Sequence, residues 1–331
     1  MLKFLASNIE QVDLALDHIS KGDANNARFG LKLIDNVVEI TLHQLAQDKQ
    51  NEVRSWMYRD ESYEHTDALT AALGQHFEPK VKFARIVGKL GAEESETLRI
   101  LHSFRNDVYH IGVQHEAILP AISRFHFKIA CEFLGRYSPS WISYSPGMAL
   151  PERARKYFKD QRWFPDAIEE YHDACVSLGN KLALDSAEFA AVLAEHLDDV
   201  IEQQDTAIDM ISTGGPRKSS RDDAVAKTMA WKIAFTDKGK AFAQEHGWSE
   251  GSVLDFVKWI ETNYPISIKT DPIAAWQKRA HAIRHEKNPH KAVKKYRDFM
   301  IQTADIRALL EEAHAQVEQY IDEQIDRMRG N

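Results

Sequence analysis

Three polar side chains with the chemistry to handle a phosphate and a proton interrupt an apolar stretch in the first half of the chain. Arg105, Asn106 and His110 fall within six residues of one another in RILHSFRNDVYHIG, residues 99–112. Their apolar neighbours are Ile100, Leu101, Phe104, Val108 and Ile111. A core normally excludes such polar groups unless they are paired or line a site. This stretch is therefore the first candidate for function.

These three residue types can together cut RNA without a metal ion. The reaction needs a group that takes the proton from the 2′-hydroxyl, a group that protonates the leaving 5′-oxygen, and positive charge beside the phosphorane. Histidine titrates in the range suited to proton transfer, and arginine grips phosphate oxygens with two donors. The pattern predicts His110 as the acid/base, Arg105 as the phosphate and transition-state contact, and Asn106 as the positioning group.

The spacing between arginine and histidine is not informative by itself, because the chain has 15 histidines. A similar interval recurs at Arg59/His65, Arg279/His285, Arg284/His290 and Arg307/His314. Only Arg105/His110 lies between two apolar segments with an asparagine directly after the arginine. Context therefore selects this pair.

Helices must position these groups, because apolar residues recur with the helical period along most of the chain. The 15 glycines and 10 prolines are few for 331 residues, which favours long helices with sparse breaks. A cap at Asp23 or Asn25 should start a long helix. The expected helices span 8–20, 26–50, 48–73, 80–91, 93–104, 118–137, 151–160, 164–182, 186–211, 222–247, 249–262 and 301–328. Only YPISIKT, residues 264–270, alternates like a strand.

A proline-rich segment predicts two domains. Residues 138–152, SPSWISYSPGMALPE, hold three prolines, which is typical of a linker. We expect a helical domain over 1–140 that carries the candidate site, and a helical domain of unknown role over 146–331. A second polar break, STGGPRKSSRDD at 212–223, predicts an exposed loop.

Composition narrows the class of protein. The net charge of −8 argues against non-specific coating of nucleic acid, although it is compatible with a local basic site. Cys131 and Cys175 form neither a disulfide framework nor a metal motif, so a reducing compartment is expected. The N-terminus lacks the features of a secretory signal, and no run approaches the roughly 20 apolar residues of a membrane span. We expect a soluble cytoplasmic protein without a cofactor, a metal or a membrane partner.

The most basic segment, residues 274–297, interleaves Trp276 and Tyr296 with lysines, arginines and three histidines. This pattern fits a nucleic-acid surface, but a solvated helix face balanced by the acidic C-terminal helix is somewhat favoured. The histidines do not indicate a metal site, because no cysteine or well-placed acid completes a ligand set. No motif for nucleotide hydrolysis or serine hydrolase chemistry is present.

The Arg-Asn-x3-His pattern resembles the hallmark of the HEPN family, an arginine and a polar residue followed by a histidine, with four to six residues between arginine and histidine. Here four residues separate Arg105 from His110. Residues 28–42, RFGLKLIDNVVEITL, resemble the first long helix of many HEPN proteins, which often carries an acidic residue facing the arginine. Asp35 and Glu39, one helical turn apart, are the matching candidates. The resemblance covers about residues 8–136.

The resemblance implies an all-α, HEPN-like bundle followed by a second helical domain. It implies a metal-independent endoribonuclease, acting as a toxin or as an effector of prokaryotic antiviral defence, that leaves a 2′,3′-cyclic phosphate. It further implies a homodimer with a composite active site, and an antitoxin or defence protein as partner. HEPN toxins that pair with a nucleotidyltransferase antitoxin carry an AMP-accepting tyrosine two residues after the histidine. Gly112 stands at that position, so adenylylation is not implied.

Two other interpretations fit the same residues. Arg105 and His110 could form a structural network with Asp35 or Glu39, in a non-catalytic HEPN scaffold that binds a partner protein or a nucleotide. Tyr109, a supporting candidate, fits helix packing better than chemistry. The third interpretation is a helical regulator that binds nucleic acid through the basic segment.

Overall fold

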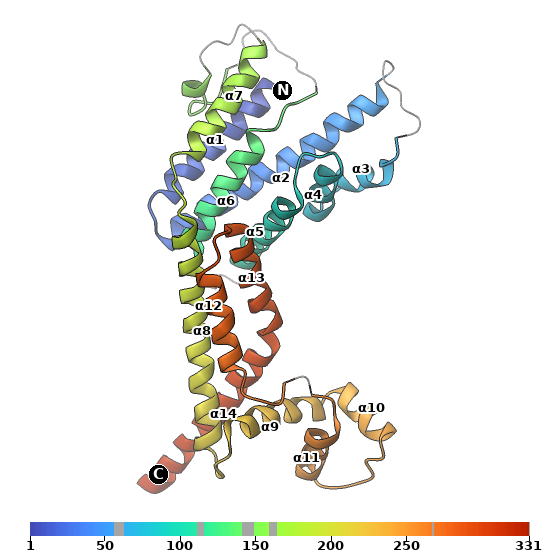
Figure 1. Ribbon diagram of the computed structural model, residues 1–331, viewed down its shortest axis with the longest axis vertical. Helices are drawn as coiled ribbons and strands as arrows, with labels where there is room; N and C mark the ends of the chain where they lie inside the picture. The colour runs from blue at the N-terminus through green and yellow to red at the C-terminus, as the bar shows by residue number, and fades with distance from the viewer. Residues whose placement is uncertain (56–62, 111–115, 141–148, 159–163, 267, 331) are drawn as a thin grey trace. The chain divides into compact units, whose positions relative to one another are not determined.

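The chain is helical throughout the residues that its computed structural model describes (Figure 1). These are residues 1–55, 63–110, 116–140, 149–158, 164–266 and 268–330, with the backbone alone described at 108–110 and 164–165. They form fourteen α-helices, one short 3₁₀ helix and no strand, which confirms the all-α prediction. No helix in these ranges combines the length and apolarity needed to cross a membrane.

The chain divides into two compact units. Unit 1 comprises Met1–Val192 with Lys287–Lys294, and unit 2 comprises Leu193–Glu286 with Lys295–Asn331. The boundary expected at 140–146 lies within the span of unit 1, where α7 (Phe164–Gly179) packs against α1 (Leu2–Ile19) and α6 (Leu119–Leu134). Residues 141–148 themselves lie outside the described residues.

The central helix of unit 1 is α2, which packs against α1, α3, α4, α5 and α6. In chain order the helices of unit 1 are α1 (Leu2–Ile19), α2 (Ala24–Arg54), α3 (Thr66–Ala72), α4 (Phe77–Ile86), α5 (Ala92–His110), α6 (Leu119–Leu134) and α7 (Phe164–Gly179). A long helix, α8 (Ser186–Gly214), begins in unit 1 and continues in unit 2.

The central helix α2 begins at one of its two predicted caps. The carboxylate of Asp23 accepts a hydrogen bond from the backbone N–H of Asn26 at 2.9 Å, which satisfies one free donor of the first turn. A glycine lets α1 approach closely, because a Cβ at Gly30 would lie 2.3 Å from Cγ1 of Ile19. One face of α2 is fully buried at Leu31, Ile34, Val38 and Leu42. This packing makes α2 a firm support for the acidic residues that it carries.

The polar helix expected over 48–73 is interrupted. α2 ends at Arg54, and Ser55 is extended with ψ of 133°. The next described helix, α3, is held by burial, since Leu69 packs in a cluster with Phe83. Polar helices without such packing are marginal in water, so helix-forming composition alone does not extend α2.

The segment before α7 does not form the helix expected over 151–160 in its described part. A buried carboxylate of α1 binds this segment instead. The described part of this segment forms only a 3₁₀ turn, η1 (Arg155–Tyr157). Asp13 of α1 accepts hydrogen bonds from Nη1 of Arg153 at 2.9 Å and from the hydroxyl of Tyr157 at 2.6 Å, and it pairs with Lys156. Burial alone would raise the pKa of Asp13, but these partners outweigh burial and lower it.

Unit 2 contains the rest of α8 and six further described helices, the fifth of which begins in unit 1. They are α9 (Arg221–Ala234), α10 (Asp237–Glu245), α11 (Val253–Asn263), α12 (Ile273–Arg284), α13 (Pro289–Gln302) and α14 (Ala304–Arg329). The single helix expected over 222–247 divides into α9 and α10. The hydroxyl of Thr236 accepts a hydrogen bond from the N–H of Gly239 at 3.0 Å and caps α10. A Cβ at Gly239 would lie 2.0 Å from the carbonyl oxygen of Ile233, so only glycine fits this corner.

Candidate functional site

The candidate motif lies on α5, which runs from Ala92 through His110 and thus joins the helix expected over 93–104 to the polar stretch. Three apolar side chains of α5 are fully buried, namely Leu98, Leu101 and Phe104. Arg105 and Asn106 are half-buried at the edge of this core. The side chains of Tyr109 and His110 lie outside the described residues. The backbone alone places His110 two turns beyond His102 on the same helix.

A buried carboxylate of α2 faces the arginine. Asp35 is fully buried, and its Oδ2 lies 3.4 Å from Nε of Arg105. Nη1 of Arg105 donates a hydrogen bond to Oδ1 of Asn106 at 2.9 Å. One third of the Arg105 side chain, 33%, remains exposed. The structure thus brings together three of the site residues expected from the sequence, and it leaves the guanidinium within reach of a ligand.

A histidine that the sequence analysis did not name completes this cluster. Nδ1 of His102 lies 3.1 and 3.0 Å from the two carboxylate oxygens of Asp35. The His102 ring stacks on Phe77 of α4, with 3.9 Å between ring centroids and 2° between ring planes. The available signal was helical spacing, because His102 precedes Arg105 by three residues and Asn106 by four, and such residues share one face of a helix.

The second acidic candidate has a different partner. Glu39 accepts a hydrogen bond at 3.0 Å from Nζ of Lys80, which is 4% exposed. The same ammonium group donates to the backbone carbonyls of Gln75 and His76 at 3.0 and 3.3 Å. All three donors of Lys80 are therefore satisfied. Glu39 anchors α4 to α2, whereas Asp35 contacts the motif itself.

Asp35, Glu39 and His102 also form the one group of three metal-ligating side chains found in the described part of the chain. Their ligand atoms lie within 4.8 Å of one another, a separation at which a cation could be held. However, Lys80 pairs with Glu39 and Arg105 pairs with Asp35. These two cations already compensate both carboxylates, so a divalent ion would add uncompensated charge to a largely buried place. The charge balance favours a metal-free cluster.

A second histidine lies near this cluster, in the core. His126 of α6 is fully buried, and neither ring nitrogen has a hydrogen-bond partner within the described residues. Burial lowers its pKa to about 4, a shift that the charge of Asp35 partly opposes and that of His102 adds to. His126 is therefore neutral at physiological pH and brings no charge to the site.

Three of the other arginines with the Arg–His spacing make polar contacts within unit 2. Arg279 donates a hydrogen bond to Gln302 at 3.0 Å, and Arg284 pairs with Asp198 at 2.6 Å. Arg307 donates to the hydroxyl of Thr303 and to a backbone carbonyl at 3.1 and 3.0 Å. Arg59, from the remaining pair, lies outside the described residues.

The basic segment 274–297 divides between α12 and α13. Its two aromatic side chains are buried, Trp276 at 5% and Tyr296 at 0% exposure. The hydroxyl of Tyr296 contacts Nδ1 of His196 on α8 at 3.0 Å. These rings pack the core and cannot serve as platforms on which exposed bases stack.

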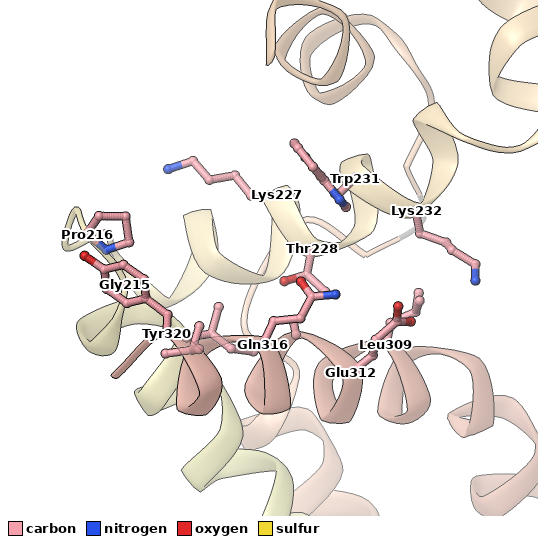
Figure 2. A pocket seen from close by; sticks show the side chains of 13 residues that line it. Gly215, Pro216, Lys227, Thr228, Trp231, Lys232, Leu309, Glu312, Gln316 and Tyr320 are labelled. Atoms are coloured by element: carbon pink, nitrogen blue, oxygen red, sulfur yellow. The ribbon is translucent and has the colours of Figure 1, made fainter. Parts of the chain in front are cut away.

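Unit 2 has a cleft of about 400 Å³ between α9, α14 and the end of α8 (Figure 2). Trp231 and Tyr320 contribute aromatic surface, and the Trp231 side chain is 43% exposed. Lys227 and Lys232 flank the α9 wall, while Glu312 lies on α14. The size and the mainly apolar lining are typical of a small-ligand site.

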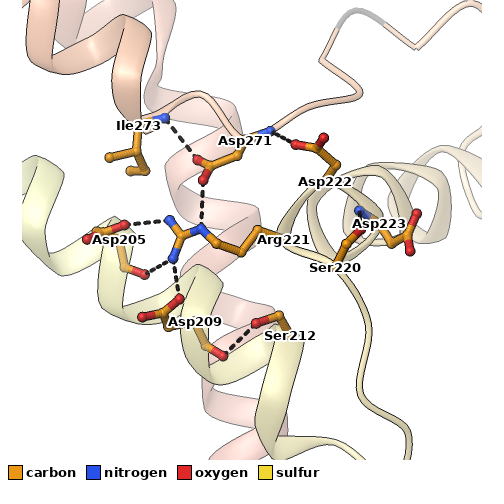
Figure 3. Close-up of polar contacts among 9 residues, drawn as sticks. All are labelled: Asp205, Asp209, Ser212, Ser220, Arg221, Asp222, Asp223, Asp271 and Ile273. Carbon is orange, nitrogen blue, oxygen red and sulfur yellow. Dashed lines mark hydrogen bonds and ion pairs between the residues drawn. The ribbon is translucent and has the colours of Figure 1, made fainter.

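A second arginine–aspartate cluster lies in unit 2 (Figure 3). Arg221, the first residue of α9, pairs with Asp205 and Asp209 of α8 and with Asp271, whose Oδ2 lies 2.6 Å from its Nε. Burial would lower the pKa of Arg221, but the three carboxylates outweigh burial and raise it. This arginine ties α8, α9 and the segment before α12 together.

The fold and the cluster define an all-helical protein whose first unit holds a carboxylate, an imidazole, a guanidinium and an amide at the edge of its core. No protein-family model, curated protein or solved structure matches the chain. The resemblance to the HEPN family thus depends on the residues of the motif and on what surrounds them.

Proposed function

We propose that the protein is a metal-independent endoribonuclease of the HEPN type. The observation that carries the proposal is the contact of partly exposed Arg105 with buried Asp35, with Asn106 bound to the same guanidinium. A carboxylate behind a partly exposed arginine holds the guanidinium in one orientation, which is what bidentate phosphate binding requires. His110 follows on the same helix and supplies the acid/base group.

In the proposed reaction the 2′-oxygen of a ribose attacks the adjacent phosphorus while its proton passes to a base. Arg105 stabilises the negative charge of the phosphorane. The bond from phosphorus to the 5′-oxygen breaks, and that oxygen takes a proton from an acid. The products are a 2′,3′-cyclic phosphate and a 5′-hydroxyl, and no metal ion takes part.

The biological role that we propose is that of a cytoplasmic toxin or an effector of antiviral defence. We further propose a homodimer in which two motifs meet in one composite cleft, held in check by an antitoxin or defence protein. Both described cysteines are free and buried, in keeping with a reducing compartment.

Cleavage assays with purified protein test the proposed function. Wild type, Arg105→Ala and His110→Ala are incubated with tRNA and mRNA pools in the presence of EDTA. We expect wild type to cleave in EDTA, and both variants to lose cleavage while keeping the helical circular dichroism spectrum. His281→Ala, at an exposed position of α12, is the matched control and should retain activity. Unchanged cleavage by His110→Ala contradicts the proposal.

A second candidate function, binding of a nucleotide or a partner protein by a non-catalytic scaffold, is favoured by the cleft in unit 2. Trp231 could stack on a base and Lys227 could pair with a phosphate. Titration with adenine nucleotides should then change the tryptophan fluorescence of wild type and not that of Trp231→Phe. This function also predicts that Arg105→Ala and His110→Ala lower stability yet leave the cellular activity intact.

A further inference from the structure

His102 has the surroundings of an acid–base group. A carboxylate can only accept hydrogen bonds, so Nδ1 of His102 donates to Asp35, at 3.0 Å from Oδ2. This contact fixes the tautomer, with the proton on Nδ1 and a lone pair on Nε2. Asp35 is fully buried, so it cannot turn away to water and release the imidazole.

The plane of the His102 ring is fixed as well as its tautomer. Phe77 lies parallel to it, with 3.9 Å between the ring centroids. Asp35 is the hydrogen-bond partner of His102 within the described residues, and 17% of the His102 side chain stays exposed. A histidine that served only to fill the core would need neither the exposed edge nor the buried carboxylate.

The helix places His102 on the motif's own face. Arg105 and Asn106 follow it by three and four residues, one turn later. Position 110 comes two turns later, about 12 Å along the helix axis. Arg105 therefore lies between positions 102 and 110. Along the helix axis, one histidine position thus precedes Arg105 and one follows it.

We propose that His102 is the general base of RNA cleavage and that Asp35 is its positioning residue. This inference rests on the proposed ribonuclease function. Nε2 of His102 takes the 2′-hydroxyl proton as the bond from the 2′-oxygen to phosphorus forms. The bond from phosphorus to the 5′-oxygen breaks, and His110 gives its proton to that oxygen. Water then carries a proton from His102 back to His110, so the enzyme is restored and nothing is oxidised or reduced.

Asp35 serves this step in two ways. It compensates the positive charge that develops on His102 when Nε2 gains a proton, and it holds Arg105 at the phosphate. The same carboxylate thus couples proton removal to charge stabilisation. This division leaves Glu39, which binds Lys80, without a part in the chemistry.

The test is the pH dependence of cleavage under single-turnover conditions with a defined RNA oligonucleotide. Wild type should give a bell-shaped profile. His102→Ala should lose about 10²- to 10⁴-fold in rate together with the acidic limb of the profile, and added imidazole should restore part of the rate. His110→Ala should lose the alkaline limb instead. His102→Gln, which keeps a hydrogen-bonding side chain, provides a second variant if His102→Ala folds poorly.

Each result decides for or against the inference. If Arg105→Ala and His110→Ala abolish cleavage while His102→Gln keeps the wild-type rate and both limbs, His102 is structural and this inference alone is overturned. If wild type cleaves no RNA, the proposed function is wrong and the inference falls with it. A lost acidic limb with imidazole rescue supports both.

Discussion

Each unit of the protein contains an arginine that contacts aspartate, and the two clusters differ in how the carboxylates are shared. Arg221 contacts three carboxylates of unit 2, two on α8 and one in the segment before α12. Asp35, the carboxylate that faces Arg105, is shared with His102. Three carboxylates around one guanidinium join helices, whereas a shared buried carboxylate holds two polar groups at an accessible edge. The two arginine side chains are exposed to a similar extent, 33% for Arg105 and 28% for Arg221. The comparison teaches that the arrangement of the carboxylates, not residue type or exposure, separates a structural arginine from a candidate catalytic one.

The largest effect that we expect from this comparison is on catalysis. Arg105→Ala should lower the rate of RNA cleavage by about 10²- to 10³-fold, because it removes a preorganised cation from the phosphorane. Arg221→Ala should cleave at the wild-type rate. Single-turnover assays on both variants measure the contrast. Equal losses in the two variants would erase the distinction between the clusters.

The next largest effect should be on the free energy of unfolding, when the ion pair between Lys80 and Glu39 of unit 1 is broken. Lys80→Met should lower the free energy of unfolding by about 2–4 kcal/mol, because it leaves Glu39 and two backbone carbonyls without their donor. Adding Glu39→Met should recover part of the loss, since an apolar pair can replace a buried ion pair. Urea unfolding measures both variants. A double variant less stable than Lys80→Met would contradict this account of the pair.

The acid stability of unit 1 should depend on His126. Its pKa in the folded state, about 4, lies below the ordinary value for histidine, so the unfolded chain binds its proton more readily. His126 therefore contributes stability above about pH 6.5, and that stability is lost as the pH falls towards 4, by up to about 1.4 kcal/mol per pH unit.

His126→Phe should remove this part of the pH dependence because phenylalanine does not titrate. Urea unfolding of wild type and His126→Phe at several pH values between 4 and 7 gives the two slopes. His281→Phe, on an exposed position, should keep the wild-type slope. If the free energy of unfolding depends on pH with the same slope in wild type and His126→Phe, then His126 is not held in the buried, neutral form in the folded protein.

The smallest effect concerns the stability of unit 2. Arg221→Ala should lower the free energy of unfolding by about 1–2 kcal/mol, because the side chains of Asp205 and Asp209 are 46% and 66% exposed and water screens their charges. High salt should reduce the difference in the free energy of unfolding between wild type and Arg221→Ala. Thermal unfolding at low and high salt tests this. A loss that is independent of salt would mean that packing, and not charge, makes Arg221 important.

Much of the fold follows from local sequence pattern. The apolar period predicts the long helices α2, α6, α8 and α14, and the cap at Asp23 fixes where α2 begins. The corner between α9 and α10 was missed, because it depends on the contact of Gly239 with Ile233. The helical period of apolar residues does not predict such a close contact between a glycine and a backbone carbonyl.

Only part of the candidate site could be predicted, because some of its contacts also join residues that are far apart in the sequence. Arg105 and Asn106 stand out because a local apolar pattern surrounds them. His102 does not stand out, since its role depends on Asp35, which is 67 residues away in the sequence. In the basic segment, Trp276 and Tyr296 suggested a surface, yet tertiary packing buries both. The sequence pattern alone does not show which distant residues pair, nor which side chains tertiary packing buries.

The most direct test of the central claim uses an RNA oligonucleotide with a single 2′-deoxy substitution at the position that wild type cuts. The account predicts cleavage of the all-ribose strand in EDTA, with a 2′,3′-cyclic phosphate at the new end detected by mass spectrometry, and no cleavage at the substituted position. Cleavage at the 2′-deoxy position, or a 5′-phosphate in the product, would contradict it.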